Sequence, residues 1–434
     1  PKQMGHLEAV PIEEVEETGQ VGVGFIQDFT SRQLLSLDAC VSCGRCQDAC
    51  PAFEAGKPLS PRDLVQDLRG RFAATAPALA AARKNGSDEE AVLAASPSLH
   101  DDGVAAETLW SCTTCNACLD VCPMAISPVG LITDLRRNLI AEGALRGPPA
   151  TALQKVQRSG NPWGLPKQER FAWADGLDVP TVKDNPGFEV LYWVGCAASY
   201  DRRIQKVAKA VVRLLQAADV NFAVLGPEER CNGEFARRMG DEFLFQELAD
   251  ATVQTLARHE VRKIVTHCPH CLNSFRQDYP QFGGEYEVMH HSELLADLVA
   301  AGRLPAAHAS ESGGNGSITY HDPCYLARVN RITDAPRQVI QACSAGADWR
   351  ELPRNRTRTA CCGAGGGRMW FDDAIDQRVG IGRIEETVQC GAGTVAVACP
   401  FCLTMMTDGL AAKAPVVQVR DLAELLAEAL PESS

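Results

Sequence analysis

The sequence lacks any run of about 18 consecutive apolar residues, the length that a membrane-spanning helix needs, and it has no basic N-terminal start followed by an apolar middle. The 434 residues are therefore expected to be soluble. Basic residues are also in deficit, because 42 Lys and Arg stand against 55 Asp and Glu for a net charge of −13. This charge disfavours a nucleic-acid-binding surface, which needs basic stripes with interleaved aromatic residues, and favours an acidic electron carrier.

Two nucleotide-binding signatures are missing from the most unusual stretch, TACCGAGGGRMW at residues 359–370. A dinucleotide-binding loop would need glycine where Arg368 stands, and a P-loop would need a Gly-Lys-Ser/Thr ending. The adjacent Cys361 and Cys362 are poor disulfide partners, since neighbouring Cα atoms lie about 3.8 Å apart, below the usual range of bridged pairs. These exclusions leave a metal site as the interpretation of the stretch.

Cysteine is abundant, at 19 residues. Secreted disulfide frameworks belong to small domains, and an odd count leaves one thiol over, so the many C-x-x-C units favour metal binding in a reducing compartment. Two runs read C-x2-C-x2-C-x3-C-P, which binds cubane [4Fe–4S] clusters in bacterial two-cluster ferredoxins. Zinc sites usually lack the third and fourth cysteine of such a run. The two runs therefore predict two cubane clusters.

In these runs three cysteines of one loop bind one cluster, and the fourth cysteine points to the other cluster. The first ferredoxin-type site is accordingly predicted at Cys40, Cys43, Cys46 and Cys122. The second ferredoxin-type site is predicted at Cys50, Cys112, Cys115 and Cys118.

The first third of the chain has helical periodicity. Residues 1–31 are acidic and weakly periodic, which indicates a linker or a docked strap. Residues 32–150 place apolar residues at helical spacing, with Ser-Pro at two helix starts, and form the predicted two-cluster ferredoxin-like domain. Within it, residues 74–103 are predicted to be an alanine-rich helical insertion, and residues 151–187 form a turn-rich connector.

The second half repeats a strand followed by a cysteine. Apolar runs lead directly into Cys196, Cys268, Cys324 and Cys399, and helical stretches separate them, which predicts parallel sheets with covering helices. Cys268 and Cys399 are 131 residues apart, and Cys196 and Cys324 are 128 apart, so the chain contains an internal duplication. Repeat 1 is predicted at 188–312 and repeat 2 at 313–434. Ligands of such folds gather at the carboxyl ends of strands, where these cysteines fall.

Repeat 2 supplies five thiols, one more than a tetrahedral zinc or a simple cubane can use. Either a cluster of open shape with a bridging thiolate uses all five, or a structural cubane leaves one thiol idle. Gly363 and Gly365, without Cβ atoms, would let the loop approach the inorganic core and aim N–H groups at its sulfurs, which raises the reduction potential. The predicted repeat-2 site consists of Cys324, Cys361, Cys362, Cys399 and Cys402.

Repeat 1 has one thiol fewer, because Asn232 stands where repeat 2 has the second of its adjacent cysteines. The four thiols could hold a third cubane, hold zinc or stand empty. His267 and His270 are candidate ligands or hydrogen-bond donors. Cys343 and Cys390 lie outside both patterns and are interpreted as buried structural thiols. The predicted repeat-1 site consists of Cys196, Cys231, Cys268 and Cys271.

Other polar groups carry weaker signals. His290 and His291 could carry protons to a substrate, or form a polar loop that leads into a helix capped by Ser292. Three pairs of adjacent arginines could receive an acidic partner, but such pairs are more often solvated helix faces. The pairs are Arg136 with Arg137, Arg202 with Arg203, and Arg237 with Arg238.

The stretches GCAASYDRR, HDPCYLARVNRI and CCGAGGGRMW, with C-P-x-C closing each repeat, resemble the CCG-domain iron–sulfur proteins related to heterodisulfide reductase subunits B and D. The resemblance covers residues 32–430 and implies a noncubane [4Fe–4S] cluster as the catalytic centre at the repeat-2 site. FIQDFTSRQLLSLDACVSCGRCQDACPAFEAGKPLSPRDL and ERCNGEFARRMGDE are more similar to the membrane-associated electron-transfer-flavoprotein:quinone oxidoreductases, including those that serve dimethylglycine-type demethylases. Those members share the missing thiol of repeat 1.

The resemblance implies an oxidoreductase subunit on the cytoplasmic face of the inner membrane. It would carry electrons from a reduced flavoprotein through the noncubane cluster and the cubanes to a cytochrome b and quinone. The cytochrome would be a membrane domain ahead of this region, usual in those members, or a separate subunit. The alternative is a disulfide reductase. A second complete CCG site would favour this alternative, but the sequence has a single complete CCG site, in repeat 2.

Overall fold

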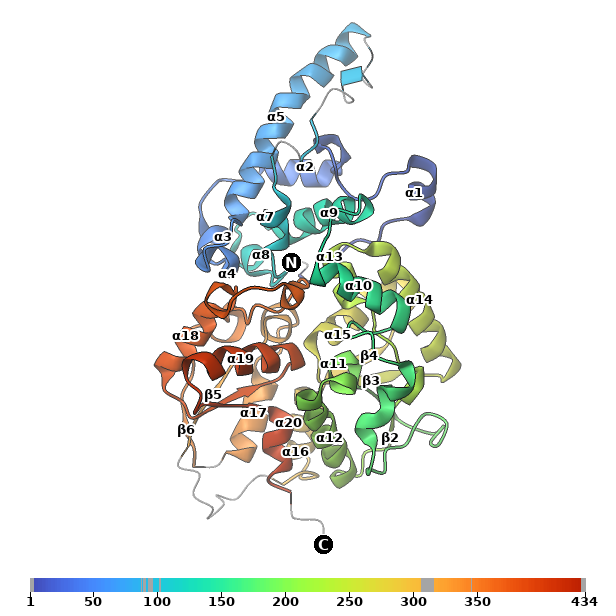
Figure 1. Ribbon diagram of the computed structural model, residues 1–434, viewed down its shortest axis with the longest axis vertical. Helices are drawn as coiled ribbons and strands as arrows, with labels where there is room; N and C mark the ends of the chain where they lie inside the picture. The colour runs from blue at the N-terminus through green and yellow to red at the C-terminus, as the bar shows by residue number, and fades with distance from the viewer. Residues whose placement is uncertain are drawn as a thin grey trace.

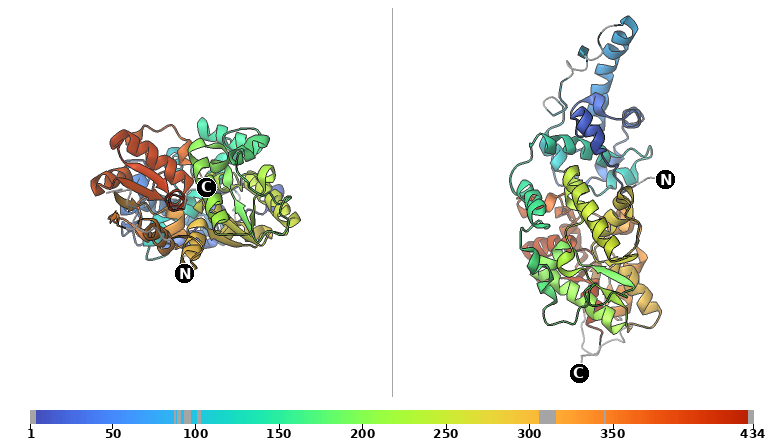
Figure 2. Two further views of the ribbon diagram at one scale, coloured as in Figure 1. Left: turned by 90° about the horizontal axis from the view of Figure 1, so that it is seen from below. Right: turned by 90° about the vertical axis from the view of Figure 1, so that its right-hand side faces the viewer.

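The computed structural model describes residues 4–86, 88, 91–92, 97–100, 103–305, 316–344 and 346–430. Two α/β units lie beside each other, and a helical region sits across one end of both, with helix α5 projecting away from them (Figure 1). Figure 2 shows the same side-by-side arrangement from below. The predicted fold class, a helical domain followed by two parallel α/β repeats, is confirmed. The predicted repeat boundary at 312 and 313 lies outside the described residues, as does part of the insertion at 74–103.

The two Ser-Pro pairs start helices as predicted. The hydroxyl of Ser60 accepts a hydrogen bond from the backbone N–H of Asp63 (3.2 Å), and that of Ser127 accepts one from Gly130 (3.2 Å), so each serine caps a helix whose first residue is proline. The main helices of this region are α2 (Ser31–Asp38), α5 (Pro61–Asn85), α7 (Ala106–Trp110) and α9 (Pro128–Ala141). Three short helices carry or flank the cysteines: α3 (Arg45–Asp48), α4 (Pro51–Glu54) and α8 (Ala117–Val121).

The predicted connector has more regular structure than its turn-rich sequence suggests. Helix α10 (Pro148–Ser159) crosses its start, and a 3-10 helix, η2 (Lys167–Ala174), follows. Proline occupies the first two positions of α10, where a missing N–H costs nothing, and Gly160 ends it in the left-handed conformation (φ 68°). The prolines and glycines thus mark helix ends here rather than a continuous loop.

Each α/β unit contains one four-stranded sheet, and every strand pair is parallel. The strand orders are β2-β1-β3-β4 and β6-β5-β7-β8, so the two sheets have the same topology and the predicted duplication is confirmed. The first sheet comprises β1 (Val190–Trp193), β2 (Phe222–Ala223), β3 (Lys263–Thr266) and β4 (Glu287–His290). The second comprises β5 (Ser317–Tyr320), β6 (Asp348–Trp349), β7 (Thr394–Val397) and β8 (Gln418–Asp421).

The central strands are buried on both faces, as the continuous apolar runs of parallel sheets require. In repeat 1 the covering helices are α11 (Gly195–Tyr200), α12 (Arg202–Ala217), α13 (Glu234–Met239), α14 (Glu242–Arg258), α15 (Pro269–Asn273) and α16 (His291–Ala300). In repeat 2 they are α17 (Asp334–Cys343), α18 (Ile381–Cys390), α19 (Pro400–Lys413) and α20 (Leu422–Ala427).

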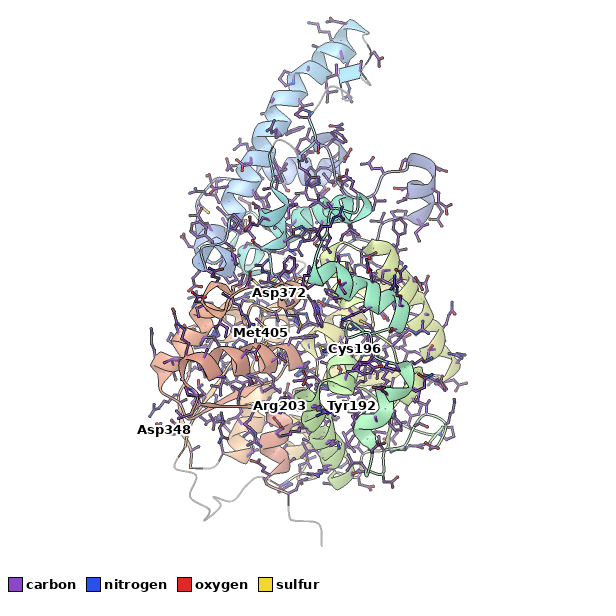
Figure 3. The ribbon with its side chains drawn as sticks, in the orientation of Figure 1. Tyr192, Cys196, Arg203, Asp348, Asp372 and Met405 are labelled. Carbon is purple, nitrogen blue, oxygen red and sulfur yellow. The ribbon has the colours of Figure 1, made fainter. Side chains whose placement is uncertain are left out.

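The repeats pack against each other through α12 and α16 on one side and α17 and α20 on the other. Arg203 of α12, labelled in Figure 3, forms a bidentate ion pair with Glu424 of α20 (2.7 and 2.8 Å) across this interface. His291 also crosses it, because its Nε2 lies 3.0 Å from Asp421 Oδ1 and both side chains are buried. The prediction that Ser292 caps α16 was wrong. The ring of His290 is the cap, and it accepts a hydrogen bond from the backbone N–H of Ser292.

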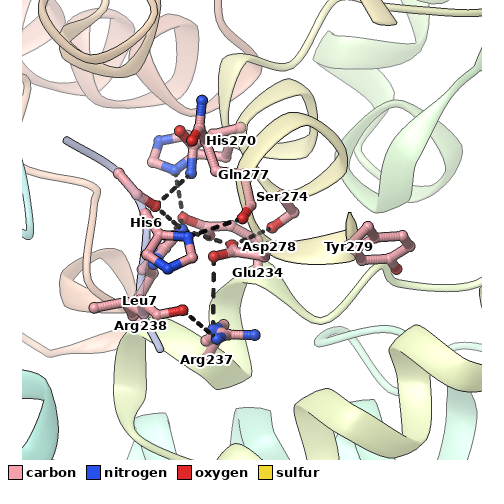
Figure 4. Close-up of polar contacts among 12 residues, drawn as sticks. His6, Leu7, Glu234, Arg237, Arg238, His270, Ser274, Gln277, Asp278 and Tyr279 are labelled. Carbon is pink, nitrogen blue, oxygen red and sulfur yellow. Dashed lines mark hydrogen bonds and ion pairs between the residues drawn. The ribbon is translucent and has the colours of Figure 1, made fainter. Parts of the chain in front are cut away.

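Residues 4–10, which we name the strap, are docked rather than free. Arg237 donates to the carbonyl of Leu7 (2.6 Å), Arg238 donates to that of Gly5 (2.9 Å), and Arg137 of α9 donates to that of Glu8 (2.7 Å). Figure 4 shows the strap beside Arg237, Arg238 and Asp278. The prediction of solvated arginine faces was therefore wrong for four of the six arginines, since Arg136, Arg137, Arg237 and Arg238 are at most 4 % exposed.

None of the helices in the described ranges has the length and apolarity to cross a membrane.

Candidate iron–sulfur sites

All 19 cysteines lie in the described ranges, and each is a free thiol. Cys196, Cys268, Cys324 and Cys399 follow the carboxyl ends of β1, β3, β5 and β7, where parallel sheets gather their ligands. Figure 3 labels Cys196 together with Tyr192 of β1. The strand-then-cysteine pattern therefore places thiols at one edge of each sheet, as predicted.

The four cysteines of the first ferredoxin-type site line one hollow. Cys46 stands on the short helix α3, and burial raises the pKa of its thiol. Cys43 is exposed, and two exposed apolar side chains, Val41 and Met124, also line the hollow. This hollow is therefore the one that lies nearest the surface of the helical region.

The four cysteines of the second ferredoxin-type site line a neighbouring hollow. Cys118 lines both hollows, so the two sites are adjacent. The backbone N–H of Thr114 donates to Cys112 Sγ (3.3 Å). Burial raises the pKa of the Cys112 thiol to about 11, although the nearby guanidinium of Arg136 opposes the shift.

The five cysteines of the repeat-2 site lie together at the carboxyl edge of the second sheet. Cys402 Sγ lies 3.3 Å from Cys362 Sγ, and Cys324 and Cys361 lie in one buried cluster. Hydrogen bonds from the thiols of Cys361 and Cys402 hold the pKa of Cys362 well below its ordinary value. Cys399 packs against Cys362 and Cys402 with Met405 beside them. All five predicted residues are thus brought together.

The glycine-rich loop makes two kinds of close approach. The N–H of Gly363 donates to Cys361 Sγ (3.3 Å), a cysteine sulfur, whereas the predicted donation to sulfurs of an inorganic core stays a prediction. At Gly365, however, a Cβ atom would lie 2.3 Å from the carbonyl oxygen of Thr113 in the second ferredoxin-type loop. Gly365 therefore brings the repeat-2 loop against the helical region, a role that the sequence alone did not indicate.

The four cysteines of the repeat-1 site line a single cavity. Cys196, Cys231 and Cys268 are buried, and Cys271 is half-buried. Asn232 is buried at the position of the missing thiol, and its amide donates to the carbonyl of Cys271 (3.4 Å). The asparagine thus braces the loop without offering a sulfur.

Arg170 is a site residue that sequence reasoning missed. Its guanidinium lies 3.5 and 3.6 Å from Cys196 Sγ and donates to Glu229 (2.7 Å), and both charged side chains are buried. The Glu229 carboxylate in turn accepts the N–H groups of Val194 (3.0 Å) and Gly195 (2.8 Å). A hydrogen bond from Cys231, together with Arg170, lowers the pKa of Cys196 to about 7 against the effect of burial. No sequence motif near Cys196 points to Arg170, because this arginine belongs to the connector, 26 residues earlier in the chain.

The histidines beside Cys268 occupy different surroundings. His270 lines the repeat-1 cavity, and its Nδ1 lies 2.9 Å from Glu234 Oε1. Burial disfavours the charged ring, but the Glu234 carboxylate outweighs it and raises the pKa of His270 to about 10. His267 instead hydrogen-bonds to the hydroxyl of Tyr192 (2.9 Å). Cys343 and Cys390 are only half-buried, so the prediction that both are buried was wrong.

The four sites form a continuous series. Cys115 of the second ferredoxin-type site lies in one buried cluster with Cys361 of the repeat-2 site, and Cys361 Sγ donates to the hydroxyl of Thr113 (3.5 Å), which lies between Cys112 and Cys115 in sequence. Tyr325, next to Cys324, hydrogen-bonds to Thr114 (2.9 Å) and stacks on His270 of repeat 1 at a centroid distance of 4.2 Å. Pro400 and Phe401, between the last two repeat-2 cysteines, line the repeat-1 cavity.

The donor sets fit iron–sulfur clusters. Each site gathers four or five free, mutually close thiols, which are mostly buried except at the first ferredoxin-type site, and soft thiolate sets of this kind bind iron–sulfur clusters or zinc. Backbone N–H groups already point at Cys112, Cys122 and Cys361, as second-sphere donors to cluster sulfurs do.

Two family models match the chain. A cysteine-rich CCG domain matches twice, at residues 190–276 and 318–407. A 4Fe-4S dicluster domain matches residues 36–126. The first model covers the two sheets with their cysteines, and the second covers both ferredoxin-type sites.

Curated relatives span nearly the whole chain. A probable iron-sulfur-binding oxidoreductase, FadF, of Bacillus subtilis is 40% identical over 98% of the chain and 64% of its own length. EtfAB:quinone oxidoreductase of Syntrophomonas wolfei is 39% identical over 96% of the chain and 61% of its own length. The D-type subunit of dihydromethanophenazine:CoB--CoM heterodisulfide reductase of Methanosarcina barkeri is 33% identical over 93% of the chain and 96% of its own length.

The chain thus spans less than two thirds of the first two relatives but almost all of the third. That full-length match, together with two CCG domains and one dicluster domain in the same order as the observed architecture, leaves one assignment. The chain belongs to the CCG-domain iron–sulfur oxidoreductases related to the D-type subunits of heterodisulfide reductase.

Proposed function

We propose that the chain is the iron–sulfur electron-transfer subunit of an electron-transfer-flavoprotein:quinone oxidoreductase. It takes electrons from a reduced flavoprotein at repeat 2 and delivers them from the ferredoxin-type sites to a membrane cytochrome b and quinone. Iron–sulfur clusters, when bound, supply the one-electron chemistry, and the chain's residues set spacing, hydrogen bonding and docking.

The junction of Cys361 with the loop of Thr113 and Cys115 carries this proposal. It joins the helical region to repeat 2, because Cys361 and Cys115 lie in one buried cluster and Cys361 Sγ donates to the hydroxyl of Thr113 (3.5 Å). A second contact at the same junction is the hydrogen bond between Thr114 of the helical region and Tyr325, the residue that follows Cys324 in repeat 2. A subunit that passes electrons between two partners needs such a continuous series, whereas a scaffold does not.

We propose the following occupancy of the four sites. Cubane [4Fe–4S] clusters bind at Cys40, Cys43, Cys46 and Cys122 and at Cys50, Cys112, Cys115 and Cys118. A noncubane [4Fe–4S] cluster binds at Cys324, Cys361, Cys362, Cys399 and Cys402. A third cubane binds at Cys196, Cys231, Cys268 and Cys271. The hollows lined by the first, second and fourth sets support this assignment, as does the sulfur contact of 3.3 Å within the third.

The partners are proposed from relatives. The name of the Syntrophomonas wolfei relative pairs EtfAB, a flavoprotein, with quinone, and a Chromohalobacter salexigens relative, 41% identical over 98% of the chain, is named a probable membrane-anchored ferredoxin. The exposed Cys43, Val41 and Met124 make the first ferredoxin-type site the accessible end of the series and the proposed exit to the cytochrome. The chain would then lie on the cytoplasmic face of the inner membrane.

Disulfide reduction is the second candidate function. The full-length similarity to the heterodisulfide reductase relative favours it. The asparagine at position 232 argues against a second noncubane centre, since it is buried, offers no sulfur and donates its amide to the carbonyl of Cys271 on α15. Disulfide reduction with an artificial donor separates the two functions, because an electron-transfer protein would show none.

The first test is a comparison of cysteine variants in the complex with flavoprotein and cytochrome partners. Cys361→Ser and Cys362→Ser should each remove one paramagnetic signal and the flavoprotein-to-quinone rate, and leave the ferredoxin-type signals. Cys390→Ser is the matched control, because Cys390 is half-buried and outside all four sites. Wild-type rates in both site variants would refute the proposal.

Metal counting on anaerobically prepared protein tests the occupancy. At four irons per cluster, about sixteen irons would fill all four sites and about twelve would leave one empty. Substitution of Cys196 by serine should lower the larger count by about four. Zinc in place of those four irons would refute the third cubane and leave the other sites unaffected.

A further inference from the structure

His321 is a buried group with no assigned role. It follows β5 directly, and its backbone N–H donates to the carbonyl of Ala396 on β7 (3.0 Å), so the main chain at this position is held within the sheet. Its side chain is fully buried, and neither ring nitrogen has a hydrogen-bond partner among the residues that the structure describes. A buried polar group without a partner is costly, so an unpaired imidazole at this place calls for a bonding partner.

The ring lies at the repeat-2 site. One ring nitrogen of His321, Cys362 Sγ and Cys402 Sγ all lie within 4.8 Å of one another. No hydrogen bond joins the ring to either sulfur, so its N–H stays available for a group held between them. Among the described residues this is the one set of three His, Cys, Asp or Glu side chains with ligand atoms so close together.

Repeat 1 has the same arrangement with another residue. Trp193 stands three residues before Cys196, as His321 stands three residues before Cys324. Its side chain is 1 % exposed and lines the cavity of the repeat-1 cysteines, and within the described part of the chain its indole N–H has no hydrogen-bond partner. Each repeat therefore places an unpaired ring N–H at the end of its first strand, beside its cysteines. His321 and Trp193 thus share the same position relative to a cysteine, the same burial and the same unused N–H, which favours a common role toward a group bound by those cysteines.

We propose that His321 donates an N–H hydrogen bond to a sulfur atom of the cluster held by the repeat-2 cysteines and thereby raises its reduction potential. The proposal rests on the function proposed above, which places that cluster at this site. Reduction adds negative charge to the sulfurs, so a fixed donor stabilises the reduced form more than the oxidised form. Every protonation state of imidazole carries at least one N–H, so the donor persists across pH. His321 is a positioning residue in this account and Trp193 its counterpart in repeat 1.

The test uses the full chain with its clusters. His321→Phe keeps the ring volume and removes the donor, whereas His321→Gln keeps an N–H. The repeat-2 signal, followed by electron paramagnetic resonance in a redox titration, should shift to more negative potential in the first variant. At the wild-type midpoint the reduced-to-oxidised ratio should fall roughly tenfold, the effect of one hydrogen bond to a charged acceptor. The glutamine variant should recover most of the shift. Trp193→Phe should leave this signal unchanged.

Iron content and the ferredoxin-type signals, measured on the same samples, report whether each variant has folded. If His321→Phe does not fold, pulsed resonance on wild-type protein in deuterated buffer replaces it and should reveal a weakly coupled exchangeable proton. An unchanged potential with the signal present, or the absence of that proton, would overturn the proposal for His321 alone. Strong nitrogen coupling to the cluster would overturn it in favour of direct ligation. A wild-type protein with no repeat-2 signal would instead overturn the function on which the proposal rests.

Discussion

Replacement of Gly365 by alanine should separate the repeat-2 loop from the helical region. A Cβ atom at this position would lie 2.3 Å from the carbonyl oxygen of Thr113, whereas ordinary contacts begin at 3.4 Å. The two nearest atoms are the backbone carbonyl oxygen and carbon of Thr113, which cannot rotate away as a side chain could. Either the glycine-rich loop of repeat 2 or the loop of Thr113 must therefore move by about 1 Å. Gly365 does not have a positive φ, so the effect is one of space and not of backbone conformation.

The magnitude follows from overpacking. Forcing one extra methyl into a tightly packed junction typically costs about 1–3 kcal/mol in the free energy of unfolding. Gly70→Ala is the matched control, since Gly70 lies in the exposed part of α5 and a Cβ there meets nothing within 4 Å. That control should gain about 0.5–1 kcal/mol from helix propensity. The two alanines should therefore change stability in opposite directions.

The assay combines chemical denaturation with rapid-mixing kinetics on the complete, cluster-loaded chain. Gly365→Ala should lower the denaturation midpoint and slow electron transfer between the repeat-2 and ferredoxin-type signals, while Gly70→Ala should slow nothing. Equal midpoints and equal rates in the two variants would show that the close approach at Thr113 has no energetic or functional weight.

Three further predictions concern the charged groups. Arg238→Met should cost about 1.5–3 kcal/mol, because Asp278 would lose its charged hydrogen bond to Arg238 (2.7 Å) and keep the longer ion pair with Arg237 (3.6 Å). Arg202→Met at an exposed position should stay within about 0.5 kcal/mol, and similar denaturation midpoints for the two variants would contradict this prediction. Arg170→Lys should remove the metal signal of the repeat-1 site and keep the signals of the other three sites, because lysine lacks the two paired N–H donors that arginine directs at Cys196. Full metal occupancy of the repeat-1 site in this variant would contradict the prediction. Hydrogen bonds from His259 and Lys183 lower the pKa of Glu228 from 4.5 to about 2, so Glu228→Gln should reduce the melting temperature at neutral pH. The difference between the two proteins should vanish as the pH falls from about 4.5 to about 2, and a constant difference would refute the linkage.

Local signals predicted much of the fold. Ser60 and Ser127 mark helix starts because capping depends on only three or four neighbouring residues. The strands before Cys196, Cys268, Cys324 and Cys399 were predictable because a strand buried on both faces is a continuous apolar run.

Distant contacts decided what the sequence could not show. Arg237 and Arg238 read as a solvated helix face, yet the strap, more than 200 residues away in sequence, supplies the carbonyl groups that bury them. Arg170 reaches Cys196 from a connector whose prolines and glycines hid its helices. The role of Gly365 was likewise invisible, because its nearest neighbour, Thr113, belongs to another region of the chain.

The most direct test of the electron-transfer series is the magnetic interaction between the second ferredoxin-type site and the repeat-2 site in fully reduced protein. Because Cys115 and Cys361 lie in one buried cluster, electron paramagnetic resonance should show mutual broadening or splitting of the two signals. The interaction should disappear in Cys362→Ser and persist in Cys390→Ser. Two sharp, independent signals in the wild-type protein would contradict the account.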